Sequence, residues 1–451
     1  MSGRPVVSVV HCVDTEGPLD ESLEATFGRL KDVFGLEFEP DEERLSRLRR
    51  GEDVPSAVRD AVVRMLDPHA GDYLRDWTAV EAMLDRTMDP AFREALPDRR
   101  GEGWISSWFC LDHVGYEHNP RRRDLGHHKV WDRYAARLAA RPGCRDILQF
   151  HYHPLPWNRM AHSCATSYLH SPHLVGILAR KLLERSWFPS VYRPGFHTIR
   201  PDSHWFLEQW FPFDYSNQST DEDIDQPDLA DGRFGDWRHA PRTWRGYHPD
   251  VRDWQREGAG RRTTFRCLNL ESRLRSLRPH HVDEAFREAR ETGRAVLAFT
   301  SHDFRDLGRE MDALRRMLGD AARRHPDVDF EYADALSAAR NVASDGAASS
   351  CGLAISLQQA DGADRLEVST RTETFGPQPF LALETDSGEV LHDNFDFGRE
   401  PTIWRYALDW QTIPLDRIRR IGVAATSPTG VVEIEVLDRA GNRIAKETLH
   451  A

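Results

Sequence analysis

Short apolar runs alternate with amphipathic stretches along the first 340 residues of the chain. The runs are typical of buried strands, and they span residues 6–13, 104–113, 146–153, 188–196, 211–219 and 294–304. Amphipathic stretches lie between them; residues 171–182, for example, begin with Ser-Pro and repeat apolar side chains at helical spacing. A last strand and helix are expected within residues 328–340. This alternation predicts parallel βα units.

Other segments depart from this pattern. Residues 36–100 are charged, helical in pattern and poor in strands, so we expect a helical insertion that covers one face of an N-terminal domain, residues 1–343. Residues 344–352 are small and polar and are interpreted as a linker. Six short strand-like runs separated by turn residues then predict an all-β sandwich over residues 353–451. We expect the sandwich to be structural and to be the surface through which a homo-oligomer would form.

Charge and composition narrow the class of protein. Lys and Arg total 60 against 73 Asp and Glu, a formal net charge of −13, which argues against nucleic acid as a partner; the basic run at residues 121–123 is expected on a solvated surface. Six scattered cysteines without a C-x-x-C pair predict reduced thiols. No run approaches the roughly 20 apolar residues of a membrane helix, and the N-terminal run is too short for a signal peptide. We therefore expect a soluble, cytoplasmic protein without a membrane partner.

Polar residues that suit chemistry collect at the C-terminal ends of the expected strands. They are Asp14, Glu16, Asp112, His113, His151, His153, Arg193 and His302. In a (β/α) barrel these strand ends converge on one face, which is the face that carries active sites. The clustering therefore indicates a common site.

Two histidines and two carboxylates of this set share a spacing of two residues. Residues two apart on a strand point to the same face, so His151 and His153 form one pair, and Asp14 and Glu16 form another. Two histidines with one carboxylate are a set that binds a catalytic metal and leaves positions open for water. The second carboxylate would then serve as a base. In the alternative interpretation, Asp14 caps the following turn and Glu16 is solvated.

The order of the motifs along the chain resembles that of the polysaccharide deacetylase family (NodB homology, carbohydrate esterase family 4). The matching segments are CVDTEGP (12–18), HYHP (151–154), YRPGF (192–196), FDYSNQS (213–219) and AFTSHDF (298–304). The resemblance covers about residues 5–340. It implies an α/β fold, a distorted (β/α)7–8 barrel, which the sandwich would follow. It also implies a divalent metal, for which we predict Zn²⁺, and removal of an N-acetyl group from an amino sugar.

The resemblance assigns roles to the motif residues. It assigns metal binding to Glu16, His151 and His153. Asp14 would be the general base, Arg193 would orient it, and His302 would protonate the leaving amine.

Two departures from the family pattern leave the ligand set open. Thr15 is inserted between the two carboxylates, and Glu16 replaces the family's second aspartate. The histidine motif is shortened from H-x-x-x-H-P to H-x-H-P. Asp112 or His113 is therefore an alternative source of a ligand, and loss of the metal is another alternative.

The substrate is indicated only by residues near these motifs. Trp237 lies in a long loop-like segment, residues 235–244, that we expect to cover the substrate, and Tyr192 and Asp303 adjoin motif residues, so these three are predicted to contact substrate. We predict an acylated amino sugar that is small or nucleotide-linked. One alternative is a C–N hydrolase of a non-sugar amide or cyclic ureide. Another is a catalytically inactive barrel that binds carbohydrate.

Overall fold

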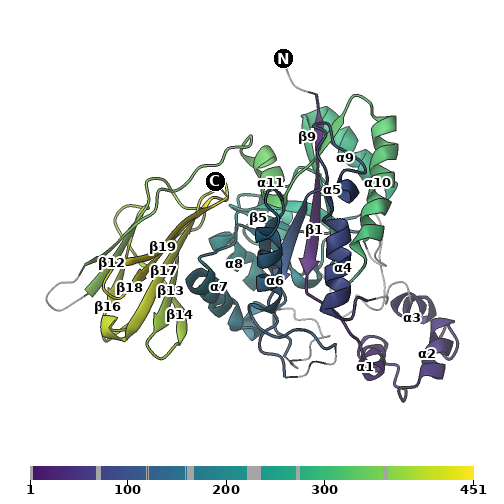
Figure 1. The fold of residues 1–451 in the computed structure, drawn as a ribbon, viewed down its shortest axis with the longest axis horizontal. Coiled ribbons are helices and arrows are strands. Elements are labelled where there is room, and N and C mark those ends of the chain that lie inside the picture. The colour runs from purple at the N-terminus through teal and green to yellow at the C-terminus, as the bar shows by residue number, and fades with distance from the viewer. Residues whose placement is uncertain are drawn as a thin grey trace.

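The computed structural model shows an α/β domain followed by antiparallel sheets (Figure 1). It describes residues 4–67, 73–117, 119, 121–157, 159, 167–220, 235–270, 275–358 and 364–450.

Seven parallel strands of the described chain close into a barrel. In spatial order they are β1 (Val6–Thr15), β2 (Ser106–Leu111), β3 (Ile147–Tyr152), β4 (Val191–Pro194), β5 (Phe213–Asn217), β8 (Thr263–Asn269) and β9 (Arg294–His302). β9 pairs back with β1 along its length, which closes the barrel. β10 (Asp329–Tyr332) pairs with the first residues of β1, on the edge whose later residues pair with β2. The predicted α/β barrel is confirmed.

The barrel strands form because both of their faces are buried. Every residue of β1 and β2 is buried, as their continuous apolar runs predict. A core cluster joins β1, β2, β4, β5 and β8 across the barrel through Val10, Phe109, Val191, Phe213 and Phe265. The helices that follow the strands are α6 (Lys129–Ala139), α7 (His173–Arg185), α8 (Pro201–Trp210), α9 (Pro279–Thr292), α10 (Leu307–Arg324) and α11 (Ala335–Ala343), with short 3₁₀ turns η1 (Tyr168–His170) and η2 (Gly195–His197).

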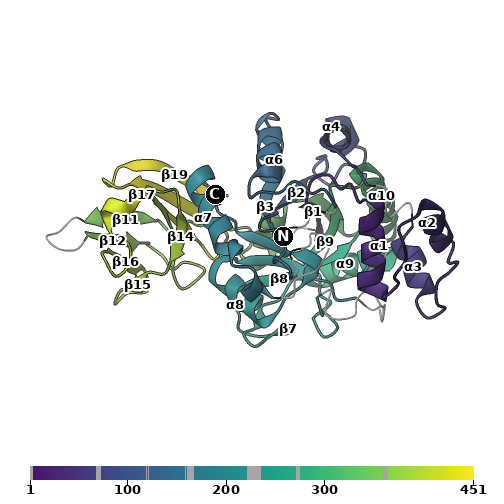
Figure 2. The same cartoon turned by 90° about the horizontal axis from the view of Figure 1, so that it is seen from below.

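The segment between β1 and β2 is helical in its described part. It contains α1 (Leu23–Phe34), α2 (Glu42–Arg49), α3 (Arg59–Met65), α4 (Trp77–Thr87) and α5 (Pro90–Arg93). The helices α1 to α3 share a small apolar cluster that includes Phe27, Leu30 and Val62, whereas α4 packs against α10. In both views α1 to α3 lie on the side of the barrel opposite the C-terminal sheets (Figures 1 and 2).

One barrel strand was not expected from the sequence. We interpreted residues 235–244 as part of a long loop-like insertion and predicted no strand between residues 219 and 294. The structure shows a hairpin, β6 (Pro249–Asp250) and β7 (Asp253–Glu257), and then β8, which pairs with both β5 and β9. The barrel closes through this strand.

The C-terminal residues form the predicted β-sandwich. Among the described residues, one sheet runs β11 (Ala354–Gln358), β12 (Asp364–Ser369), β16 (Ile403–Leu408) and β15 (Asp396–Phe397). The other runs β14 (Val390–Asp393), β13 (Phe380–Thr385), β17 (Ile418–Thr426), β18 (Val432–Asp438) and β19 (Arg443–Leu449), with the 3₁₀ turn η4 (Leu415–Arg417) before β17. Residues such as Leu366 and Trp404 from the first sheet pack with Leu381 and Ile421 from the second.

The outer face of the β13–β17 sheet packs on the barrel domain. Phe380 contacts the rings of Phe188 and Trp210, with centroids 5.0 and 5.2 Å apart. A Cβ at Gly422 would lie 3.0 Å from Leu183 in α7, so the sheet and helix approach closely there. Strand β13 is therefore buried on both faces. None of the described helices combines the length and apolar character needed to cross a membrane.

Candidate metal centre

The C-terminal ends of four barrel strands bring the predicted site residues together. β1 carries Asp14 near its end and leads to Glu16, β3 carries His151 and leads to His153, β4 carries Arg193, and β9 ends at His302. Because the strands are parallel, these ends open on the same face of the barrel. The residues that the sequence predicts for one site therefore lie on one face of the barrel.

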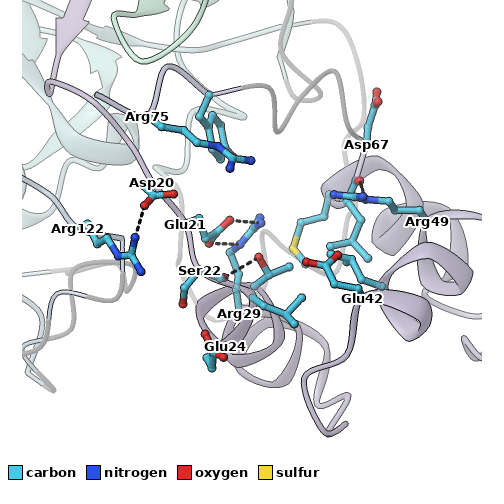
Figure 3. A pocket seen from close by; sticks show the side chains of 16 residues that line it. Asp20, Glu21, Ser22, Glu24, Arg29, Glu42, Arg49, Asp67, Arg75 and Arg122 are labelled. Atoms are coloured by element: carbon cyan, nitrogen blue, oxygen red, sulfur yellow. Dashed lines mark hydrogen bonds and ion pairs between the residues drawn. The ribbon is translucent and has the colours of Figure 1, made fainter. Parts of the chain in front are cut away.

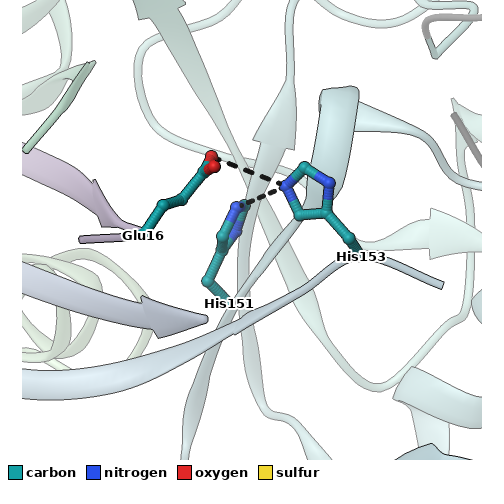
Figure 4. Close-up of side chains that lie close together, drawn as sticks. All are labelled: Glu16, His151 and His153. Atoms are coloured by element: carbon teal, nitrogen blue, oxygen red, sulfur yellow. Dashed lines mark hydrogen bonds and ion pairs between the residues drawn. The ribbon is translucent and has the colours of Figure 1, made fainter. Parts of the chain in front are cut away.

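Three of these side chains form a donor group suited to a metal ion. The ligand atoms of Glu16, His151 and His153 all lie within 4.8 Å of one another (Figure 4). The two Nε2 atoms are 3.0 Å apart, and His153 Nε2 lies 3.8 Å from Glu16 Oε1. Two ligands each about 2.0–2.1 Å from a tetrahedral zinc ion are themselves roughly 3.3 Å apart, so these separations fit one ion. The expectation that His151 and His153 share a face is confirmed.

Hydrogen bonding leaves the metal-facing nitrogen of His151 free to bind. Nδ1 of His151 lies 3.0 Å from the carbonyl oxygen of Arg193, to which it can donate. With the proton on Nδ1, the lone pair is on Nε2, which faces His153. The carbonyl therefore sets the tautomer that metal binding needs.

His153 is held by the turn that follows β4. A Cβ at Gly195 would lie 2.4 Å from Cγ of His153, so the ring occupies space that only glycine leaves. The ring of Phe196 contacts His153 edge-on, and Phe196 and His197 both have positive φ angles, 52° and 51°. Non-glycine residues in this conformation are strained and often mark functional sites. Burial and the adjacent His151 lower the pKa of His153 to about 3, so it is neutral, as a ligand must be.

Glu16 is buried beside a cation that keeps it ionised. Its Oε2 forms an ion pair with Arg123 Nη2 at 2.6 Å, which leaves Oε1 toward the histidines. Burial favours a higher pKa for Glu16, but the charge of Arg123 and the nearby histidines hold the pKa well below its usual range. Residues 121–123 were expected on a solvated surface, and for Arg123 this expectation is wrong, because that side chain is only 6% exposed and pairs with Glu16.

Asp14 and Arg193 form a buried two-point ion pair beside the donor group. Arg193 Nε and Nη2 donate to the two oxygens of Asp14 at 2.7 and 2.9 Å. The second terminal nitrogen, Nη1, donates to the carbonyl of Tyr215 at 2.7 Å and contacts Cys267 Sγ at 3.0 Å. Burial opposes ionisation of Asp14, but Arg193 and His151 keep its pKa far below the usual value. Asp14 is thus a charged carboxylate in fixed orientation.

His302 is the most accessible member of the constellation. Its side chain is 30% exposed, and Nε2 lies 3.9 Å from both Asp14 Oδ2 and Glu16 Oε1. Burial lowers the pKa of His302 to about 4 despite the two carboxylates. A protonated imidazole in this position would be a strong proton donor.

Asp112 and His113, the alternative ligands, lie outside the donor group of the described residues. Asp112 pairs with the buried Lys181 at 3.2 Å, and burial raises its pKa to about 6. His113 is buried, and burial and Arg123 lower its pKa to about 4. The donor group is complete without either residue.

The three residues predicted to contact substrate are buried and bonded within the protein. Trp237 is 1% exposed and donates to the carbonyl of His197 at 2.8 Å. The Tyr192 hydroxyl bonds that of Tyr168. Asp303 is fully buried and accepts three hydrogen bonds from neighbouring segments. Their contact with substrate stays a prediction, and the structure gives each a supporting role.

A separate polar cavity of about 490 Å³ lies among the helices that follow β1 (Figure 3). The N-terminus of α1, α2 and the end of α3 line it, together with Arg75 and Arg122. Arg122 pairs with Asp20 and Arg29 with Glu21, so much of the charge in its wall is already balanced. None of the donor residues lines this cavity.

Comparison with known proteins assigns no family. No protein-family model matches the chain, and no curated protein matches its sequence. The geometry of the barrel mouth therefore carries the functional argument.

Proposed function

We propose that this protein is a metal-dependent hydrolase that removes an N-acyl group, most simply acetyl, from an amino-sugar-type substrate. The observation that carries the proposal is the group of Glu16, His151 and His153 beside the Asp14–Arg193 pair at the mouth of a parallel barrel. The ordered motifs that resemble polysaccharide deacetylases support the same reaction.

The donor chemistry fits a divalent ion, for which we propose Zn²⁺. Two imidazole nitrogens and one carboxylate oxygen suit a borderline metal and leave coordination positions open. A bound ion would lower the pKa of a water molecule and polarise an acyl carbonyl.

The remaining residues supply the proton transfers. Asp14, held ionised by Arg193, would accept a proton from water. His302, on the accessible side, would deliver a proton to the leaving nitrogen. Arg193 would keep the carboxylate oriented through both of its bonds. The amino-sugar substrate, small or nucleotide-linked, rests on the motif resemblance.

Metal analysis and a substrate panel test the proposal. Wild-type protein, His151→Ala and His153→Ala would be compared for bound metal by mass spectrometry, with the exposed His239→Ala as a matched control. Acetate release would be measured from free and nucleotide-linked N-acetylamino sugars and from a simple N-acetyl amine, with ammonia release from a cyclic ureide measured in parallel. We expect one ion in the wild type and control, loss in both site variants, and activity on the amino sugars. A wild type that binds no divalent ion would refute the proposal, and activity confined to the ureide would replace its substrate.

A further inference from the structure

Asp303 follows His302 in the sequence but serves a different part of the site. Its Oδ1 accepts from the backbone N–H of Glu16 at 2.8 Å, and Oδ2 accepts from the N–H of Gly17 at 2.9 Å. Oδ2 also accepts from the Tyr134 hydroxyl of α6 at 2.9 Å. The side chain is fully buried. Asp303 thus ties the segment after β1 to β9 and to α6.

The backbone at residues 16 and 17 is shaped around this carboxylate. Gly17 has φ of +73°, a conformation that allows two consecutive N–H groups to converge on one anion. A Cβ at Gly17 would lie 3.0 Å from the ring of Trp77, so the turn is also closely packed. The carboxylate of Asp303 fills the position that an anion would take.

Glu16 needs such support because it lies beyond the sheet. The last residue of β1 that pairs with β2 is Thr15, and pairing with β9 ends at Asp14. The N–H groups of Glu16 and Gly17 therefore have Asp303 where a strand would have a ladder partner. Arg123 fixes the far end of the Glu16 side chain, whereas Asp303 fixes its backbone.

We propose that Asp303 is a positioning residue, which acts through the backbone of Glu16 to set the affinity of the donor group for its metal. The inference rests on the proposed metal-dependent function. Asp303 bonds the backbone at Glu16 and Gly17 rather than a ligand atom of the donor group. It therefore determines the backbone position from which the Glu16 side chain extends. Outer partners of metal ligands typically contribute 10- to 100-fold in affinity.

The test compares Asp303→Asn with Asp98→Asn, which alters another buried aspartate that accepts hydrogen bonds from backbone N–H groups. Asp98, in the loop before β2, is 7% exposed and accepts from the N–H groups of Arg100, Glu102 and Tyr332. In Asp303→Asn the new NH₂ group faces an N–H donor. Zn²⁺ affinity would be measured by competition with a chromophoric chelator, and the melting temperature of the metal-free protein would be measured for each variant. We expect about 10- to 100-fold weaker zinc binding in Asp303→Asn and wild-type affinity in Asp98→Asn, although both melt earlier.

Tyr134→Phe keeps the inference testable if Asp303→Asn does not fold. It removes one bond to the carboxylate and should weaken zinc binding roughly 2- to 10-fold. Wild-type zinc affinity in folded Asp303→Asn, or in Tyr134→Phe where the former does not fold, overturns the inference and leaves the proposed function standing. A wild type that binds no zinc overturns both.

Discussion

Replacing Gly195 with alanine tests whether the turn after β4 holds His153 in its metal-facing position. The added Cβ would lie 2.4, 2.5 and 2.7 Å from three ring atoms of His153, and Cβ atoms rarely approach within 3.4 Å of a neighbour. The ring must therefore move by about 1 Å, whereas metal–ligand distances tolerate only about 0.2 Å. The ring cannot keep its 3.0 Å separation from Nε2 of His151 after such a shift. Weaker metal binding follows although no ligand is removed.

The expected loss is about 10- to 100-fold in zinc affinity, or about 1.4–2.7 kcal/mol. Competition with a chromophoric chelator measures the affinity, and circular dichroism checks the fold. Gly176→Ala in α7 is a matched control, because a Cβ there meets no atom within 4 Å and alanine should stabilise the helix by about 0.5–1 kcal/mol. A folded Gly195→Ala protein with wild-type zinc affinity would show that His153 is not a ligand or is not held by this turn.

Changes at three other places in the chain should alter turnover, acid stability and solubility. Asp14→Asn should retain zinc but lose turnover by about 10²–10⁴-fold, the usual contribution of a general base; loss of zinc instead would make Asp14 a ligand. His11 is buried with its pKa lowered to about 3 by burial and Arg93, so stability present above its unfolded value near 6.5 should fall as the pH drops. At pH 4.5 the loss is about 2–3 kcal/mol, and urea denaturation should show His11→Gln losing less between pH 7 and 4.5 than wild type does. A chain that ends at Ser344 uncovers the surface of Phe188 and Trp210, so it should be less soluble and melt earlier yet keep zinc in its folded fraction; unchanged solubility and melting would contradict this.

Strands buried on both faces were predictable because their own sequences are continuously apolar. β1 is apolar along most of its length and needs no distant partner to be identified. β8 was missed because Arg266 interrupts it. That arginine is 2% exposed, donates to the Ser219 carbonyl at 2.7 Å and lies over the ring of Trp244. Such partners come from distant segments, so the local pattern resembles a polar loop.

The same limit explains which parts of the site were missed. The spacing of His151 and His153 predicts a shared face from the geometry of one strand. The role of Arg123 depends on Glu16, which lies more than one hundred residues earlier, and a run of three arginines looks the same whether solvated or buried. Glycine in the turn after β4 is likewise explained only by the ring of His153. Long-range partners, rather than motif residues, are what the sequence left undetermined.

Thr15 leaves the two carboxylates on the same side of the chain, because β1 stays extended through it. Side chains alternate along a strand, so Asp14 and Glu16, two apart, both face the barrel mouth, while Thr15 turns away and bonds the carbonyl of Val13. The histidine pair follows the same rule, since His151 and His153 are also two apart and converge. At the end of β9, adjacent residues diverge instead: His302 faces the two carboxylates, and Asp303 turns to Tyr134 and the backbone of Gly17. Spacing of two thus gathers the reactive groups, and spacing of one separates a reactive residue from a supporting one.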